Sequence, residues 1–314
     1  MMKLTFEQIK TVTFGALSVK QEGEKLLFCK CTAKQVAAWH ALSAGLGMRA
    51  ETTTGIRLDF HTDSQNLTVD AAEGDKFEVH INGLARYRVH AEEYRAKGEK
   101  MVFSLGEGEK RVTLIFPSHS KGVLTSVELD DGATLLPHQH SRNILFIGDS
   151  ITQGWNSRYD SLSYAWRVTS FFDANSLIQG IGGAYFHEST ADTLDFDADT
   201  VVVAYGTNDF GHYKTLGDLE HHANLFFSRV AEQYGKKRCF AITPIYRADM
   251  DVPKAMGSFS QCRAVVEAAA KQHGFTVVDG LTLVPHNDDF MADAVHPNDF
   301  GFGVFAENLI KQLY

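Results

Sequence analysis

The sequence predicts an α/β protein in two parts: an antiparallel β-sandwich of jelly-roll type, followed by a three-layer α/β/α sandwich with a parallel, flavodoxin-like sheet. Over the first ~135 residues, short strand-like runs alternate with glycine and Asx turns, which is typical of β-sandwiches. From residue 141 the pattern becomes strand, helix, strand, which is typical of a parallel sheet covered on both faces. We therefore predict two domains, at residues 1–138 and 139–314.

The first part contains seven runs that we expect to form strands. They lie at residues 25–31, 56–61, 66–70, 76–81, 100–105, 111–116 and 123–130. Turn sequences such as Glu-Gly-Asp at 73–75 and Gly-Glu-Gly at 106–108 separate them. One stretch, 33–46, interrupts the pattern, and we expect it to hold a helical turn.

The second part begins with Ile-Leu-Phe-Ile at 144–147, an apolar run typical of a buried parallel strand. Four further strands are expected at 176–180, 200–205, 238–243 and 275–279. Helices are expected at 164–172, 216–234, 258–273 and 303–313, because their apolar residues recur at helical spacing.

Composition excludes several functional classes. The net charge of −9 argues against an electrostatic grip on nucleic acid or on an anionic membrane. The N-terminus lacks the apolar core of a secretory signal, so we expect a cytoplasmic protein. Its four cysteines are expected to be free thiols, and whether the chain forms a homo-oligomer stays open.

Four polar or glycine-rich segments carry the candidate chemistry. Gly-Asp-Ser at 148–150, Gly-Gly at 182–183 and Gly-Thr-Asn-Asp at 206–209 each follow a predicted strand, and Asp-Ala-Val-His at 293–296 lies near the end of the chain. Alone, each could be an ordinary turn or helix cap. Because ligands of parallel sheets bind at the carboxyl ends of the strands, their joint occurrence predicts one site.

Together these segments resemble the conserved blocks of the SGNH, or GDSL-like, hydrolases over roughly residues 142–314. The resemblance implies a serine esterase in which Ser150 is the nucleophile, His296 its general base and Asp293 the carboxylate that orients the imidazole. No Gly-x-Ser-x-Gly elbow surrounds Ser150, so the α/β-hydrolase arrangement does not apply.

The resemblance also implies an oxyanion hole, formed by the backbone amides of Ser150 and Gly183 and the side chain of Asn208. Gly182 is the alternative to Gly183, because the family often has Asn ahead of the glycines where this chain has Ile-Gln at 178–179. Such a site requires neither a metal nor an organic cofactor.

Several aromatic residues follow the site segments, and they could line a substrate pocket or pack at the domain junction. They are Trp155, Tyr185, Phe186, Phe210 and Tyr246. His138 and His140 form a His-x-His pair in the linker, for which the sequence offers no third metal ligand.

A β-sandwich ahead of an SGNH domain is similar to the arrangement in family 2 carbohydrate esterases. This similarity implies that the substrate is a small acyl ester, acetyl above all, on a carbohydrate. A lipase or thioesterase of the same family is an alternative, and so is an inert glycan-binding or structural protein. The sandwich could bind glycans, complete the cleft or mediate dimerisation.

Overall fold

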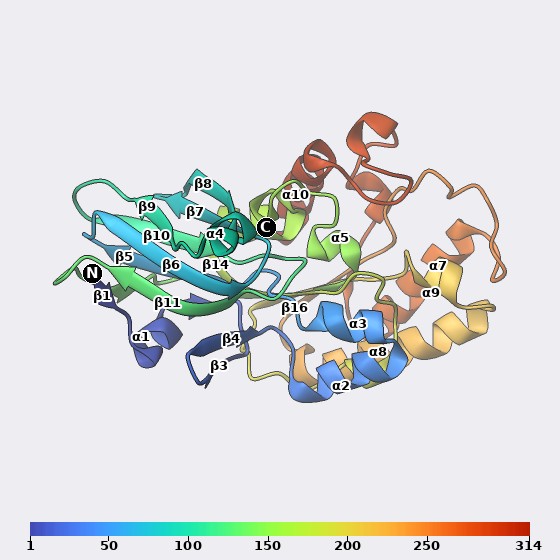
Figure 1. The fold of residues 1–314 in the computed structure, drawn as a ribbon. Helices are drawn as coiled ribbons and strands as arrows, with labels where there is room; N and C mark the ends of the chain where they lie inside the picture. The colour runs from blue at the N-terminus through green and yellow to red at the C-terminus, as the bar shows by residue number, and fades with distance from the viewer.

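The computed structural model describes residues 1–314 and contains three β-sheets (Figure 1). Two antiparallel sheets lie in the N-terminal part, and a parallel five-stranded sheet lies in the C-terminal part. The predicted fold class is therefore confirmed. None of the helices combines the length and the hydropathy that a bilayer span requires.

The N-terminal sheets face each other across one apolar core. The first contains β3 (Ser18–Glu22), β4 (Lys25–Cys29), β11 (Val123–Leu129), β6 (Asn66–Glu73) and β9 (Met101–Ser104) in this order, with β1 (Met2–Lys3) paired to β11. The second contains β12 (Leu136–Pro137), β5 (Arg57–Thr62), β10 (Lys110–Ile115), β7 (Lys76–Ile81) and β8 (Leu84–His90), with β2 (Thr13–Phe14) paired to β5. Alternate residues of both sheets, such as Phe60 and Val69, are fully buried between them.

The third sheet is entirely parallel. Its strand order is β14 (Ala174–Gly180), β13 (Arg142–Gly148), β15 (Thr200–Ala204), β16 (Arg238–Ile242) and β17 (Thr276–Val278). Side chains of β13 alternate between the faces: Leu145 and Ile147 belong to one core cluster, whereas Ile144 and Phe146 belong to the other.

Helices cover both faces of the parallel sheet. One face packs against α6 (Tyr164–Phe171) and α10 (Asp299–Leu313), and the other against α8 (Leu216–Tyr234) and α9 (Phe259–Gln272). The helices α2 (Ala33–Leu42) and α3 (Ala44–Ala50) of the N-terminal part join this second layer, because Trp39 and Leu46 share its core cluster. Part of the predicted first domain thus packs on the second.

The structure adds elements that the sequence analysis did not identify. The edge strands β3 and β8 expose most of their residues and place only Val19, Tyr87 and Val89 against the core, so their apolar pattern is weak. The helices α1 (Phe6–Thr11) and α4 (Ala91–Lys97) were also missed, and residues 33–50 form two helices instead of one turn. The last helix begins at Asp299, four residues before the predicted start, because Asn298 caps it by accepting from the amides of Phe300 and Gly301.

A buried ion-pair network joins the second sheet to the loop before β14. Arg111 donates to both carboxylate oxygens of Asp59, at 2.8 and 2.7 Å, and to Asp173 at 2.8 Å. Burial alone would raise the pKa of Asp59, but the hydrogen bonds from Arg111 and the charge of Arg57 lower it. Arg57 also donates to the carbonyl of Ala174 at 2.7 Å, so the network connects the two parts of the chain.

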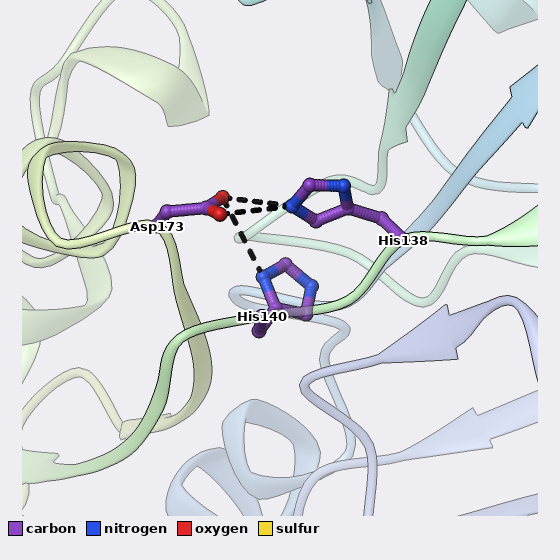
Figure 2. Close-up of side chains that lie close together, drawn as sticks. All are labelled: His138, His140 and Asp173. Carbon is purple, nitrogen blue, oxygen red and sulfur yellow. Dashed lines mark hydrogen bonds and ion pairs between the residues drawn. The ribbon is translucent and has the colours of Figure 1, made fainter.

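The linker histidines lie beside this network, where Asp173 supplies the third group that the sequence did not reveal (Figure 2). His138 Nε2 lies 3.0 Å from both carboxylate oxygens of Asp173, and its Nδ1 lies 3.0 Å from His61. Arg111 already neutralises Asp173, and Arg57 donates to His140 Nε2 at 3.3 Å. The guanidinium groups of Arg111 and Arg57 thus lie next to Asp173 and His140. Their positive charges disfavour a metal cation at this position and favour a hydrogen-bonded network that joins the two parts of the chain.

Replacing Arg111 with Met is predicted to lower the free energy of unfolding by about 3 kcal/mol, because the buried carboxylate of Asp59 loses its bidentate partner. Urea unfolding measures the change. Arg86→Met is the control, since Arg86 is exposed and its side chain makes no hydrogen bond. Equal stability of the two variants would contradict the proposed importance of the network.

Candidate active site

Ser150 lies at the carboxyl end of β13, between the ends of β14 and β15. Asp149 caps the short helix α5 (Ser150–Gln153) by accepting from the amide of Ile151 at 2.9 Å, and Ser150 is the first residue of that helix. Gly148 is required immediately before, because a Cβ there would lie 2.0 Å from Thr152 Oγ1. The turn thus places the Ser150 hydroxyl at the edge of the sheet.

The structure brings Ser150, His296 and Asp293 together. Ser150 Oγ lies 2.8 Å from His296 Nε2, and His296 Nδ1 lies 2.9 Å from Asp293 Oδ2. The loop itself holds this geometry, since the amides of Val295 and His296 both donate to Asp293 Oδ1 at 2.8 Å. A hydroxyl, an imidazole and a carboxylate therefore form one continuous hydrogen-bonded chain.

Asp293 is held in its charged form. Partial burial would raise the pKa of this carboxyl, but hydrogen bonds from the backbone amides of His296 and Val295 and from the His296 ring lower it to about 2. Asn156, whose φ of 69° places it in the left-handed region, donates to Asp293 Oδ2 at 2.7 Å. A charged Asp293 can fix the tautomer of His296 and stabilise its protonated form.

The loop after β14 leaves the amide of Gly183 free. The amides of Ile181 and Ala184 donate to the carbonyls of Gly148 and Ile181, and the amide of Gly182 donates to Gln153 Oε1 at 2.7 Å. The Gly183 N–H donates to no group of the protein. Since the Gly182 amide is engaged, the geometry favours Gly183 as the backbone donor to a substrate oxygen.

Two further donors are available nearby. The Ser150 N–H, at the start of α5, has no acceptor in the protein. Asn208, just before the short helix α7 (Asp209–His212), donates through Nδ2 to the carbonyl of Ala184 at 2.9 Å. An amide side chain carries two N–H bonds, so one of them remains for a ligand.

The predicted pocket residues have different environments. Trp155 is 37% exposed, and its ring centroid lies 6.4 Å from that of His296. Tyr185 is partly buried and stacks on His212 at 3.7 Å, and Tyr246 stacks on His286 at 4.8 Å. Phe210, like Phe186, is completely buried in the core, so it presents no surface to a substrate and its expected pocket role needs correction.

Three residues near the site were not singled out from the sequence: His119, Gln153 and Asn156. His119 comes from the N-terminal part, and its ring contacts Trp155 edge-on at 5.0 Å. Gln153 and Asn156 follow Ser150 closely, which was the one signal that could have drawn attention to them. Their partners, Gly182 and Asp293, lie far away in the sequence.

Two buried carboxyls lie beneath the site. Burial raises the pKa of Asp149 and of Asp209 to about 7. Asp209 Oδ1 accepts from the amide of Phe186 at 2.9 Å, whereas its Oδ2 has no partner. These groups fix the backbone around the nucleophile and around Asn208, and neither is bonded to the hydroxyl of Ser150.

A three-layer α/β fold with a serine, a histidine and a carboxylate at its sheet edge defines the class of acyl hydrolases. The family model of the GDSL-like lipases and acylhydrolases matches residues 146–303, half of the chain, so the protein belongs to that family. It is thus an ester-hydrolysing enzyme. No curated protein matches the chain.

Solved structures share the whole architecture. A salicylyl-acyltransferase, SsfX3, from a tetracycline biosynthetic pathway is 20% identical with a TM-score of 0.78, covering 96% of this chain and 93% of its own. A GDSL-like lipase from Bacteroides ovatus is 15% identical with a TM-score of 0.74, and the match covers 98% of this chain and 95% of the lipase. A family 2 carbohydrate esterase from Clostridium thermocellum, in complex with cellohexaose, is 17% identical with a TM-score of 0.64. This match covers 83% of this chain and 92% of the esterase. At these identities the likeness establishes the fold.

Asp209→Asn is predicted to gain thermal stability over the wild type as the pH rises from about 4 to about 7. In this window folded Asp209 keeps a proton that the unfolded chain releases, so rising pH destabilises the wild type, while Asn cannot ionise. Melting temperatures across this range test it, with Asp251→Asn, an exposed residue, as control. A difference that does not change with pH would contradict the raised pKa.

Proposed function

We propose that this enzyme hydrolyses a small acyl ester, an acetyl ester on a carbohydrate, with Ser150 as nucleophile, His296 as general base and Asp293 as its orienting carboxylate. One observation carries the proposal: the hydroxyl, imidazole and carboxylate are connected by contacts of 2.8 and 2.9 Å, next to a backbone amide that has no other acceptor.

The reaction follows from this arrangement. His296 Nε2 takes the proton of Ser150 as Oγ attacks the ester carbonyl, and the imidazolium is stabilised by Asp293. The N–H groups of Ser150, Gly183 and Asn208 donate to the oxyanion of the tetrahedral intermediate. His296 then protonates the departing alcohol, which leaves an acyl-enzyme. Water, deprotonated by His296, attacks this ester and releases the acid and the free hydroxyl of Ser150.

Two observations support a carbohydrate acetate as the substrate. Trp155 presents a partly exposed aromatic face beside His296, and such a face suits the apolar side of a sugar ring. The structural neighbours include family 2 carbohydrate esterases and an acetyl xylan esterase from a rumen bacterium.

A groove of about 550 Å³ between β3, β4 and α2 contains none of the three proposed catalytic residues, so it provides no acyl channel to Ser150.

Transfer of the acyl group to an alcohol is the second candidate. It is favoured by the likeness over nearly the whole chain to a salicylyl-acyltransferase. Both reactions share the same acyl-enzyme and differ in the nucleophile that attacks it. Adding a sugar alcohol to the assay separates them, because transfer yields a new ester while hydrolysis yields free acid.

Ser150→Ala is predicted to reduce kcat for p-nitrophenyl acetate at least about 10⁴-fold and to abolish labelling by a fluorophosphonate probe. The melting temperature should stay near that of the wild type. Ser170→Ala, on the exposed side of α6, is the control and should be labelled like the wild type. If Ser150→Ala keeps wild-type turnover, Ser150 is not the nucleophile.

Acyl chain length tests the substrate class. We predict that kcat/KM for p-nitrophenyl acetate exceeds that for the octanoate roughly tenfold or more, since the groove of about 550 Å³ does not include Ser150. Acetylated xylo- and cello-oligosaccharides should release acetate in the same assay. A preference for octanoate would replace the carbohydrate esterase with a lipase.

A further inference from the structure

The free N–H of Gly183 and the carbonyl oxygen of Gly182 belong to the same peptide group. The oxygen of this group is not free: Arg49 Nη1 donates to it at 3.0 Å. Arg49 comes from α3 in the N-terminal part, 133 residues before Gly182 in the sequence. A charged side chain of one part of the molecule therefore holds the proposed oxyanion peptide of the other.

The contact is close and specific. Arg49 is half-buried and forms no ion pair with a carboxylate. A Cβ added to Gly182 would lie 3.1 Å from Arg49 Cδ, and one added to Gly183 would lie 3.6 Å from Leu46 Cδ2, on the same helix. The α3 helix thus packs directly on the glycine pair.

Arg49 has two physical effects on this peptide. It fixes the orientation, because a peptide between two glycines has few steric restraints and Gly183 adopts a φ of 81°, which favours glycine. It also polarises the amide, since a charge-assisted bond to the oxygen strengthens the donor at the other end of the same peptide. Both effects favour a bond from Gly183 N–H to a developing negative charge.

We propose that Arg49 is a positioning residue for the oxyanion hole, acting through the Gly182 carbonyl. This inference rests on the proposed esterase function and adds to it a role for the N-terminal part in the chemical step. Arg49 itself does not touch the substrate. Its effect therefore belongs in kcat, because the oxyanion forms after the substrate has bound.

Neighbouring contacts hold the rest of the loop. The buried Lys30 Nζ donates to the carbonyl of Gly180 at 2.9 Å and to the hydroxyls of Thr52 and Thr54 at 2.8 Å. Gln153 accepts from the Gly182 amide, and its Nε2 donates to the carbonyl of Ser118 at 2.7 Å. With these groups in place, removing Arg49 releases the 182–183 peptide while the remainder of the loop stays anchored.

Arg49→Met tests the proposal by steady-state kinetics on p-nitrophenyl acetate. We expect kcat to fall about 10- to 100-fold, less than or similar to the loss of one oxyanion donor, with KM within about twofold of the wild type. Arg49→Lys should recover part of kcat, because an ammonium can still donate to the Gly182 oxygen. Arg86→Met is the control and should match the wild type.

A second measurement excludes a merely structural effect. A trifluoromethyl ketone forms a tetrahedral adduct on the serine, so its affinity should fall in Arg49→Met by the same factor as kcat/KM, while the melting temperature stays within a few degrees. If Arg49→Met does not fold, Arg49→Gln and Arg49→Lys provide the same comparison.

Three outcomes would overturn the inference. An unchanged kcat in Arg49→Met would show that the peptide needs no support. A raised KM at unchanged kcat would show that the guanidinium binds the substrate directly. Wild-type enzyme that neither hydrolyses esters nor reacts with a fluorophosphonate would remove the proposed function itself, which the first two outcomes leave intact.

Discussion

The register of three parallel strands is the constraint on which the candidate site depends. Gly148 of β13 pairs with Gly180 of β14 on one side and with Ala204 of β15 on the other. The three strands therefore end level, and the loops that follow them bring Ser150, Gly183 and Asn208 to one edge. A shift of one residue in either pairing would move a donor by about 3.3 Å, more than the length of a hydrogen bond. Small residues at these ends let the loops approach closely: a Cβ on Gly180 would lie 2.4 Å from the backbone nitrogen of Gln153.

Features that depend on local sequence were predictable. The parallel sheet and its active edge are identified by the apolar run at 144–147, the helical spacing at 216–234 and the position of Gly-Asp-Ser at a strand end. Buried strands and amphipathic helices have regular patterns of apolar residues that are visible in the sequence. The elements that were missed have a weaker apolar pattern. In β8 most side chains are exposed on an edge strand, and only Tyr87 and Val89 alternate as partly buried apolar residues, which is too short a pattern to identify a strand.

Contacts between distant segments could not be predicted. Gln153 meets Gly182 because α5 lies against the end of β14, and Arg49 meets Gly182 because the two parts of the chain pack together. Asp59 meets Arg111 because β5 and β10 are neighbours in one sheet. Single-residue preferences contain no information on such pairs. The sequence left the choice between Gly182 and Gly183 open for this reason. A long-range hydrogen bond, from the Gly182 amide to Gln153, distinguishes the two glycines.

The shared core of α2, α3 and the parallel sheet has a consequence for how such chains can change. Trp39 and Leu46 pack in the same apolar cluster as Leu145 and Val203, and Lys30 reaches the end of β14. The N-terminal part is consequently not a detachable module that recombination could exchange as a cassette. A fragment with the hydrolase motifs alone would expose the apolar surface that α2 and α3 cover. In this enzyme, substitutions in one part therefore constrain the substitutions that the other part can accept. A sandwich taken from a relative would fit only together with that relative's own glycine loop.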